Sequence, residues 1–175
     1  MTIELDVRDL VGRPGSSRAV HVAEPVAGLR TGLAVVPEDR AVDLDLLLES
    51  VVEGILASGP LEGVMTLQCA RCLKPFEGSF RLDLREMFVP GTSTEVDEYP
   101  LVEGFVDVEP MIRDAVVLSM PFAPLCRQDC LGLCDRCGGD RNVGECRCPP
   151  EPDPRWSALH TLGVEWPTGP DDGIP

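Results

Sequence analysis

Alternating apolar and polar positions dominate the middle of the chain and predict a β-sheet. Apolar residues alternate with acids over 42–49, and a similar alternation follows over 62–68 and over 76–88. A period of two residues places apolar side chains on one face of a strand and polar side chains on the other. We therefore expect strands at 42–49, 54–58 and 62–68, with a long antiparallel partner over 76–88.

The first part of this pattern has a helical alternative. Leucine and valine residues between 44 and 56 also recur at the spacing of one helix face. Gly54 and the Gly59-Pro60 pair argue against one long helix, because glycine and proline are poor helix formers. We favour strands in this segment and keep the helix as the alternative.

One helix is predicted after the strands. Pro110 suits a first helical turn, and Asp107 or Glu109 can start the helix. Apolar residues then share one face as far as Ser119, and Pro121 ends the element. The predicted fold class is therefore α+β, an antiparallel β-sheet core with one packed helix.

Composition divides the chain into four parts. Residues 1–41 alternate only briefly before a run rich in glycine and proline, so we expect an irregular segment packed on the core. The sheet and the helix occupy 42–125, and a small cysteine-rich zinc module follows over 126–148. The last part, 149–175, is a proline-rich tail with a short predicted helix at 154–162.

The tail helix carries an apolar stripe. Asp153 can cap this helix, Pro154 can open it, and Trp156, Leu159 and Leu162 share a face. The stripe either packs on the protein's own domain or contacts a partner. Trp156 and Leu159 are therefore candidate partner-binding residues.

The charge balance favours a basic partner. The 30 acidic residues outnumber the 15 basic ones and give a net charge of −15. Such a charge opposes the phosphate contacts behind most nucleic-acid affinity, so we expect neither DNA binding nor a broad RNA-binding face. It attracts basic proteins and speeds their association.

Acidic residues are concentrated between the strands and the helix. Residues 93–109 carry six acids and no base. An acidic run of this kind is either a solvated loop or a docking patch. The candidate partner-binding residues in it are Glu95, Asp97, Glu98 and Glu103.

The sequence shows no membrane or export segment. No apolar run reaches the ~18–20 residues of a helix that spans a bilayer. The N-terminus lacks the basic stretch and the following apolar stretch of a signal peptide. We expect a cytoplasmic protein without a membrane partner.

All eight cysteines occur in short-spaced pairs, which is typical of metal-binding thiolates. They are Cys69, Cys72, Cys126, Cys130, Cys134, Cys137, Cys146 and Cys148. A short spacer lets both sulfurs of a pair reach one ion, and four thiolates make a tetrahedral zinc site. Zinc is therefore the expected cofactor, with reversible disulfides and unligated thiols as the alternatives.

Eight thiolates match two zinc ions. The preferred sets are Cys69, Cys72, Cys126 and Cys130 for one ion, and Cys134, Cys137, Cys146 and Cys148 for the other. The glycine-rich loop between the last two pairs can fold back and bring them together. Crossed sets, or one site with spare cysteines, are the alternatives.

Four motifs follow one another around these cysteines. The first is Leu67-x-Cys69-x-Arg71-Cys72-Leu73-x-Pro75-Phe76, and the predicted helix ends in Leu118-Ser119-Met120-Pro121. The third is Leu125-Cys126-x-x-x-Cys130-x-Gly132-Leu133-Cys134-x-x-Cys137-Gly138, closed by Cys146-x-Cys148, and the fourth is Asp153-Pro154-Arg155-Trp156-x-x-Leu159. In order and spacing the motifs, over about 42–162, resemble the YceD family of large ribosomal RNA subunit accumulation proteins. The last motif departs from the family's Asn-Pro-Phe-x-x-Leu at Asp153 and Trp156, which keep a cap and an aromatic anchor.

The resemblance implies a role in ribosome biogenesis, in support of the accumulation of large-subunit ribosomal RNA. Family genes commonly neighbour the gene for a small zinc-ribbon protein of the large subunit. The implied partner is therefore a basic large-subunit protein or an assembling large subunit, and direct RNA contact is not favoured. Some relatives lack the later cysteine cluster, so metal binding is not the whole function.

Catalysis is not expected. The two histidines, His21 and His160, stand beside no nucleophile motif, and zinc sites made wholly of cysteine lack the open position that catalysis needs. The alternative function is a zinc–thiolate redox-sensing regulator. Arg71, Arg136 and Arg147 flank the thiolates and can lower the pKa of those cysteines.

Overall fold

The structure is a computed structural model, and it describes residues 2–91, 98–144, 146–149 and 155. The chain divides into two compact units, Met1–Gly132 and Leu133–Pro175. The boundary therefore follows Gly132, whereas the sequence places the start of the cysteine-rich module at 126. Of the predicted tail helix, only Arg155 is among the described residues.

The first unit is built on one curled sheet of eight strands. The strand order is β1-β8-β7-β6-β5-β4-β2, with β3 paired to β5 beside this path. All pairings are antiparallel except that of β6 with β7, which is parallel. The strands are β1 (Glu4–Asp6), β2 (Ser17–Glu24), β3 (Ala34–Val35), β4 (Val42–Ser50), β5 (Ile55–Gln68), β6 (Pro75–Pro90), β7 (Glu98–Val102) and β8 (Phe105–Asp107).

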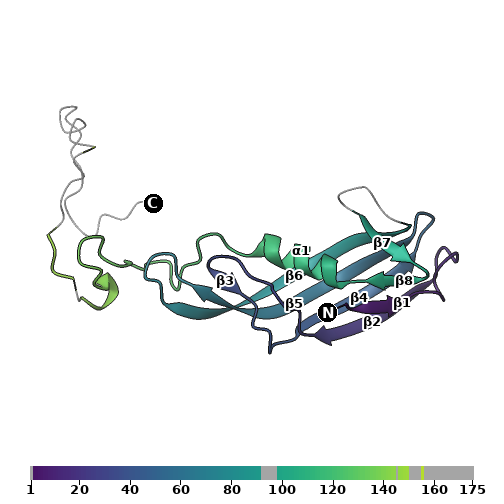
Figure 1. Cartoon of the computed structure of the whole chain (residues 1–175), viewed down its shortest axis with the longest axis horizontal. Helices are drawn as coiled ribbons and strands as arrows, with labels where there is room; N and C mark the ends of the chain where they lie inside the picture. The colour runs from purple at the N-terminus through teal and green to yellow at the C-terminus, as the bar shows by residue number, and fades with distance from the viewer. Residues whose placement is uncertain (1, 92–97, 145, 150–154, 156–175) are drawn as a thin grey trace. The chain divides into compact units, whose positions relative to one another are not determined.

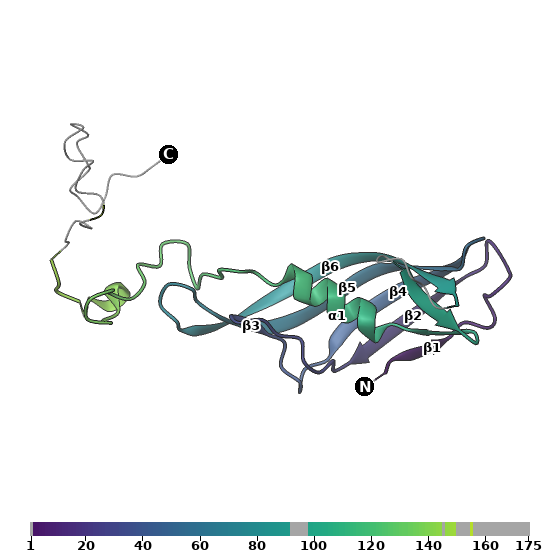
Figure 2. The same ribbon diagram turned by 45° about the horizontal axis from the view of Figure 1, so that its top comes forward.

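The helix α1 (Glu109–Ser119) lies across one face of this sheet, as Figures 1 and 2 show. Its buried Met111, Ile112 and Val116 join the core that the inward side chains of the strands form. Oδ1 of Asp107 accepts a hydrogen bond from the backbone N–H of Glu109 at 3.1 Å and so supports the first turn. The predicted helix is confirmed. Within the described part of the chain, no helix is long and apolar enough to cross a membrane.

The period of two residues along β4 decides between strand and helix. Its four inward apolar side chains are at most 2% exposed, whereas Asp43 and Asp45 between them are exposed. This alternation is the pattern of a strand with one buried face. The prediction of strands is therefore confirmed, and the helical alternative is wrong.

The strands predicted at 54–58 and 62–68 form one continuous strand, β5, which corrects the expectation of a break at Gly59-Pro60. Through both residues β5 keeps its register with β6, while the register pairs with β4 leave both out. A Cβ atom on Gly59 would lie 1.9 Å from the backbone oxygen of Asp45 in β4. Gly59 fits because the backbone of β4 leaves no room for a Cβ atom there. Pro60 is tolerated because it stands where β5 has no register pair with β4.

Three strands lie within residues 1–41, which corrects the expectation of an irregular segment. β2 pairs with β4 along its whole length, from Ser17 opposite Glu49 to Glu24 opposite Val42. The alternation around Val20 and Val22 is the only sequence signal for β2. The segment forms a strand in spite of this weak signal because the long β4 provides a pairing partner. The tendency of a segment to form a strand depends strongly on such neighbours.

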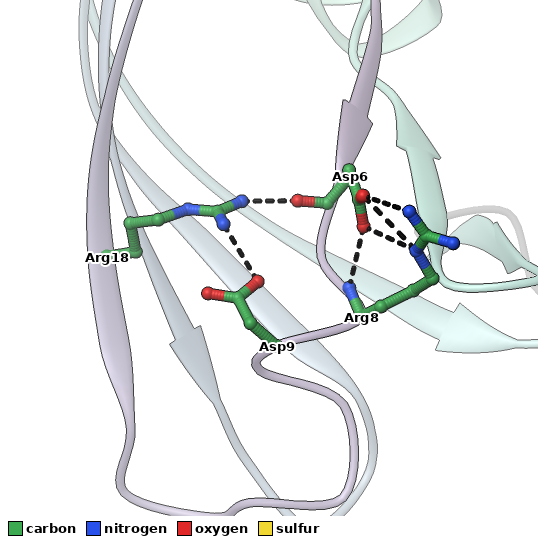
Figure 3. A network of polar contacts seen from close by, with 4 residues as sticks. All are labelled: Asp6, Arg8, Asp9 and Arg18. Carbon is green, nitrogen blue, oxygen red and sulfur yellow. Dashed lines mark hydrogen bonds and ion pairs between the residues drawn. The ribbon is translucent and has the colours of Figure 1, made fainter.

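The two end strands of the sheet order, β1 and β2, are joined by the side chain of Arg18 (Figure 3). Arg18 of β2 donates a hydrogen bond to the backbone oxygen of Asp6 in β1 and pairs with Asp9 at 2.8 Å. Asp6 in turn pairs with Arg8 at 2.6 Å, and this guanidinium holds the pKa of the carboxyl at about 2. Arg18 therefore links the two edges of the curled sheet.

We expect Gly54→Ala to lower the free energy of unfolding by about 1–3 kcal/mol, the usual cost of overpacking. Gly54 stands just before β5, and a Cβ atom there would lie 2.0 Å from the backbone oxygen of Phe88 in β6. Gly32→Ala is the control, because nothing lies within 4 Å of a Cβ atom at that position. Urea unfolding followed by circular dichroism measures both variants. Equal stability of the two would contradict the close approach of β5 and β6.

Candidate metal centres

The turn between β5 and β6 places two cysteines close together. The backbone N–H of Cys69 donates to the oxygen of Lys74 at 3.0 Å, and the N–H of Leu73 donates to the oxygen of Cys69 at 2.9 Å. Leu73 has a φ of 60°, a left-handed conformation that is unusual for a bulky residue. The tight turn keeps Cys69 and Cys72 at one end of the hairpin.

The segment after α1 returns to this turn and brings two more cysteines. The backbone N–H of Ala70 donates to the oxygen of Pro124 at 2.8 Å. Nη1 of Arg71 donates to the backbone oxygen of Cys130 at 2.9 Å. The sulfur atoms of Cys69, Cys72, Cys126 and Cys130 consequently lie within 4.8 Å of one another. We call this set the first tetrad.

The sulfur separations suit a tetrahedral metal ion. Cys69 and Cys130 have their Sγ atoms 3.8 Å apart, and Cys72 and Cys126 have theirs 3.7 Å apart. Four sulfurs at about 2.3 Å from a central ion lie about 3.8 Å from one another. A disulfide would need sulfurs only about 2.05 Å apart. The first tetrad can therefore hold one metal ion.

The first tetrad belongs to the interior of the first unit. Cys69, Cys72 and Cys130 are at most 4% exposed and pack against Phe76 and Leu125, while Cys126 is exposed. Backbone N–H groups of Cys126 and Cys72 lower the pKa of Cys69 to about 6. Desolvation and the neighbouring thiols raise the pKa of Cys126 to about 12. N–H groups directed at one sulfur stabilise its thiolate, which is the form that binds metal.

The second tetrad lies within the second unit and is built from a tight turn and a short helix. The backbone N–H of Cys134 donates to the oxygen of Gly139 at 2.8 Å, and the N–H of Gly138 donates to the oxygen of Cys134 at 2.9 Å. Gly138 has a φ of +70°, which glycine adopts without strain. A 3-10 helix, η1 (Arg141–Val143), follows. The sulfurs of Cys134, Cys137, Cys146 and Cys148 lie within 4.8 Å of one another.

Charge around the second tetrad is partly compensated by arginine. Nη2 of Arg141 lies 3.8 Å from Sγ of Cys134 and 2.9 Å from the carboxylate of Asp135. Backbone N–H groups of Cys137 and Arg136 lower the pKa of Cys134 to about 6. The Cys137 thiol and desolvation raise the pKa of Cys148 to about 12. The second tetrad thus repeats the pattern of the first, with one stabilised thiolate in each set.

The two tetrads differ in exposure. Three of the four cysteines in the first are buried, whereas only Cys134 is buried in the second. Cys137 is exposed, and Cys146 and Cys148 are half-buried. An ion in the second tetrad would therefore be easier to reach from solvent.

The structure groups the eight cysteines in the two sets that their spacing favours. Glu98 is half-buried in β7, and Glu103 is exposed in the turn that follows it. The other candidate partner-binding residues, Glu95, Asp97, Trp156 and Leu159, lie outside the described residues.

Sequence reasoning missed the contact of Arg141 with a sulfur atom. The guanidinium of Arg71, expected to flank a thiolate, instead bonds the carbonyl of Cys130. Arg141 is the first residue of η1, and Asp140 caps this helix through Oδ1, which accepts from the N–H of Asn142 at 2.8 Å. An Asp two residues before Asn is a capping signal that locates this turn.

We expect the purified, reduced protein to carry about two metal ions per chain, one per tetrad. Cys72→Ser and Cys137→Ser should each remove one ion. Because metal binding is coupled to folding, Cys72→Ser should destabilise the sheet, while Cys137→Ser should leave it folded. Plasma emission spectrometry and circular dichroism measure both effects. Loss of both ions in either variant would contradict two separate sites.

We also expect a chelator to remove the two ions in two phases, the second tetrad losing its ion about tenfold faster, because a buried site must first open. The chelator is 4-(2-pyridylazo)resorcinol, and the absorbance of its metal complex measures the rate at which each ion is released. Cys137→Ser should lack the fast phase, and Cys72→Ser should lack the slow one. A single phase in the wild-type protein would show that exposure does not govern release.

Comparison with known proteins identifies relatives over most of the chain. Residues 57–163 match the family model described as large ribosomal RNA subunit accumulation protein YceD. An uncharacterized protein of Mycobacterium tuberculosis and one of Mycobacterium bovis are each 38% identical over 92% of this chain and 82% of their own length. One of Mycobacterium leprae is 34% identical over 90% of this chain and 76% of its own. No solved structure matches the chain. The motifs around the cysteines and the family model agree, and the chain belongs to the YceD family.

Proposed function

We propose that this protein is a ribosome biogenesis factor that acts as a binding module for a basic large-subunit protein or for an assembling large subunit. The match to a family described by the accumulation of large-subunit ribosomal RNA carries this proposal. The net charge of −15 supports a basic partner over free RNA. The role implies action in the cytoplasm, where ribosomes assemble, without a membrane or DNA partner.

Zinc is the metal that we propose for both tetrads. Four thiolates at tetrahedral spacing are a donor set that zinc prefers, and each filled site adds negative charge to an acidic protein. All eight cysteines would be ligands. In the first tetrad the ion would cross-link the β5–β6 turn to the segment after α1, and in the second it would hold the turn at Cys134 to the chain after η1.

The proposed role is non-catalytic. A site with four protein ligands leaves no position for a substrate or an activated water. Each tetrad supplies four sulfurs, so both fit closed, structural sites. The redox-sensing alternative is favoured by the exposure of one cysteine in each tetrad, Cys126 in the first and Cys137 in the second. It applies more to the second tetrad, where Cys134 is the one buried cysteine of the four.

The acidic run and the tail stripe are the proposed partner contacts. Of the acidic run, Glu98 and Glu103 lie within the residues that the structure describes, and Glu103 is exposed. Glu95 and Asp97 extend the run in sequence, and we keep all four as a proposed docking patch. Trp156 and Leu159 remain a proposed apolar anchor, in which burial of each side chain is worth about 1.5–3 kcal/mol.

Neutralising the docking patch with Glu95→Gln, Asp97→Asn, Glu98→Gln and Glu103→Gln should slow association with purified large-subunit proteins by about tenfold at low salt, because charge mainly sets the on-rate. The salt dependence of the rate should flatten. Stopped-flow fluorescence with each labelled ribosomal protein measures both.

The matched control removes four exposed charges elsewhere, with Glu24→Gln, Glu38→Gln, Asp39→Asn and Asp43→Asn. This variant has the same net charge, so a local patch predicts a smaller effect on the rate. Tight binding to protein-free large-subunit RNA, with an unchanged complex after neutralisation of the patch, would contradict the proposed function.

A further inference from the structure

An apolar cavity of about 330 Å³ opens at the end of the sheet where β5 begins. Its lining includes Val11, Pro14, Val52, Ile55, Pro90 and Leu101. Ile55 and Leu101 are 1% and 6% exposed, while Val52 is 86% and Val11 41% exposed. The cavity therefore combines a buried apolar lining with apolar side chains that remain in contact with solvent.

Backbone hydrogen bonds hold two walls of this cavity, the loop before β2 and the β4–β5 turn. Gly15 N–H donates to the oxygen of Ser50, and Ser50 N–H donates to the oxygen of Ser16, both at 2.9 Å. Val51 N–H closes the β4–β5 turn on Gly54 at 2.9 Å. The ion pair between Arg18 and Asp9 ties together the two ends of the loop that carries Val11 and Pro14 (Figure 3). A cavity held in this way is preformed, so binding costs little ordering.

The segments around the cavity are acidic. Glu53 follows Val52 in the β4–β5 turn, and Glu98 and Glu103 stand on either side of Leu101 in sequence. Within three sequence positions of the lining, the described acids outnumber the described bases: the acids are Asp9, Glu49, Glu53, Glu98 and Glu103, and the bases are Arg8 and Arg13. An apolar site among acids complements a basic segment that carries an apolar side chain.

We propose that this cavity anchors one aliphatic or aromatic side chain of a basic protein segment. The inference rests on the proposed function for the nature of the partner and adds the site at which the partner docks. The volume lies in the range of ligand pockets, about 300–1,000 Å³, which accommodates such a side chain. Val52 and Val11 are exposed to solvent and extend the apolar surface beyond the cavity. A protein segment can cover this additional surface, whereas a small ligand enclosed in the cavity cannot.

The test uses the metal-loaded full chain and individually purified large-subunit proteins as probes. Val52→Lys places a positive charge beside the cavity and should weaken the tightest complex by about tenfold or more, as loss of a central anchor does. Val35→Lys is the matched control, because Val35 is an exposed valine of β3, which pairs with the far end of β5. Both positions are exposed, so neither change should unfold the chain.

Methyl NMR adds a direct readout. The methyl signals of Ile55 and Leu101 should shift in the wild-type complex and in the Val35→Lys complex. Equal affinity of the wild-type chain, Val52→Lys and Val35→Lys for the partner would overturn the cavity as an anchor. So would a complex in which the methyl signals of Ile55 and Leu101 do not shift. Either result would leave the proposed function standing. Failure of the wild-type chain to bind any large-subunit protein or an assembling large subunit would overturn both.

Discussion

The long antiparallel pairing of β5 with β6 is the constraint on which the rest of the first unit depends. It runs from Ile55 opposite Phe88 to Gln68 opposite Pro75 without a break. The turn at one end carries Cys69 and Cys72, and Ile55 at the other end lines the apolar cavity. A slip of one residue would turn the inward side chains to solvent, so burial specifies the register and with it both sites. The glycines at 54 and 59 allow neighbouring backbones to approach β5 at these positions.

The two tetrads have different relations to this framework. In the first, the contact between Cys72 and Cys126 spans 54 positions of sequence, so a bound ion would close a long loop that includes β6 and α1. Its free energy of binding would then count toward the stability of the whole unit. The second tetrad connects residues within 134–148, and one of its four cysteines is buried, against three of four in the first. We therefore propose a structural role for an ion in the first tetrad and a more accessible ion in the second.

The features that depend on residues near one another in sequence could be predicted from the sequence. The alternation along β4, the start of α1 at Pro110 and the grouping of the cysteines follow from periodicity, capping chemistry and spacing. β2 and the continuity of β5 through Gly59 could not be predicted, because each depends on how closely a neighbouring strand approaches. The cavity could not be predicted from the sequence either, because its lining comes from four segments that only the fold brings together.

The proposed function is that this acidic chain supports accumulation of large-subunit ribosomal RNA. The most direct measurement is the ratio of large- to small-subunit ribosomal RNA in cells depleted of the protein, with the wild-type chain restored as the control. The account predicts that depletion lowers the ratio, that the wild-type chain restores it, and that Cys72→Ser fails to do so. An unchanged ratio after complete depletion would contradict the account.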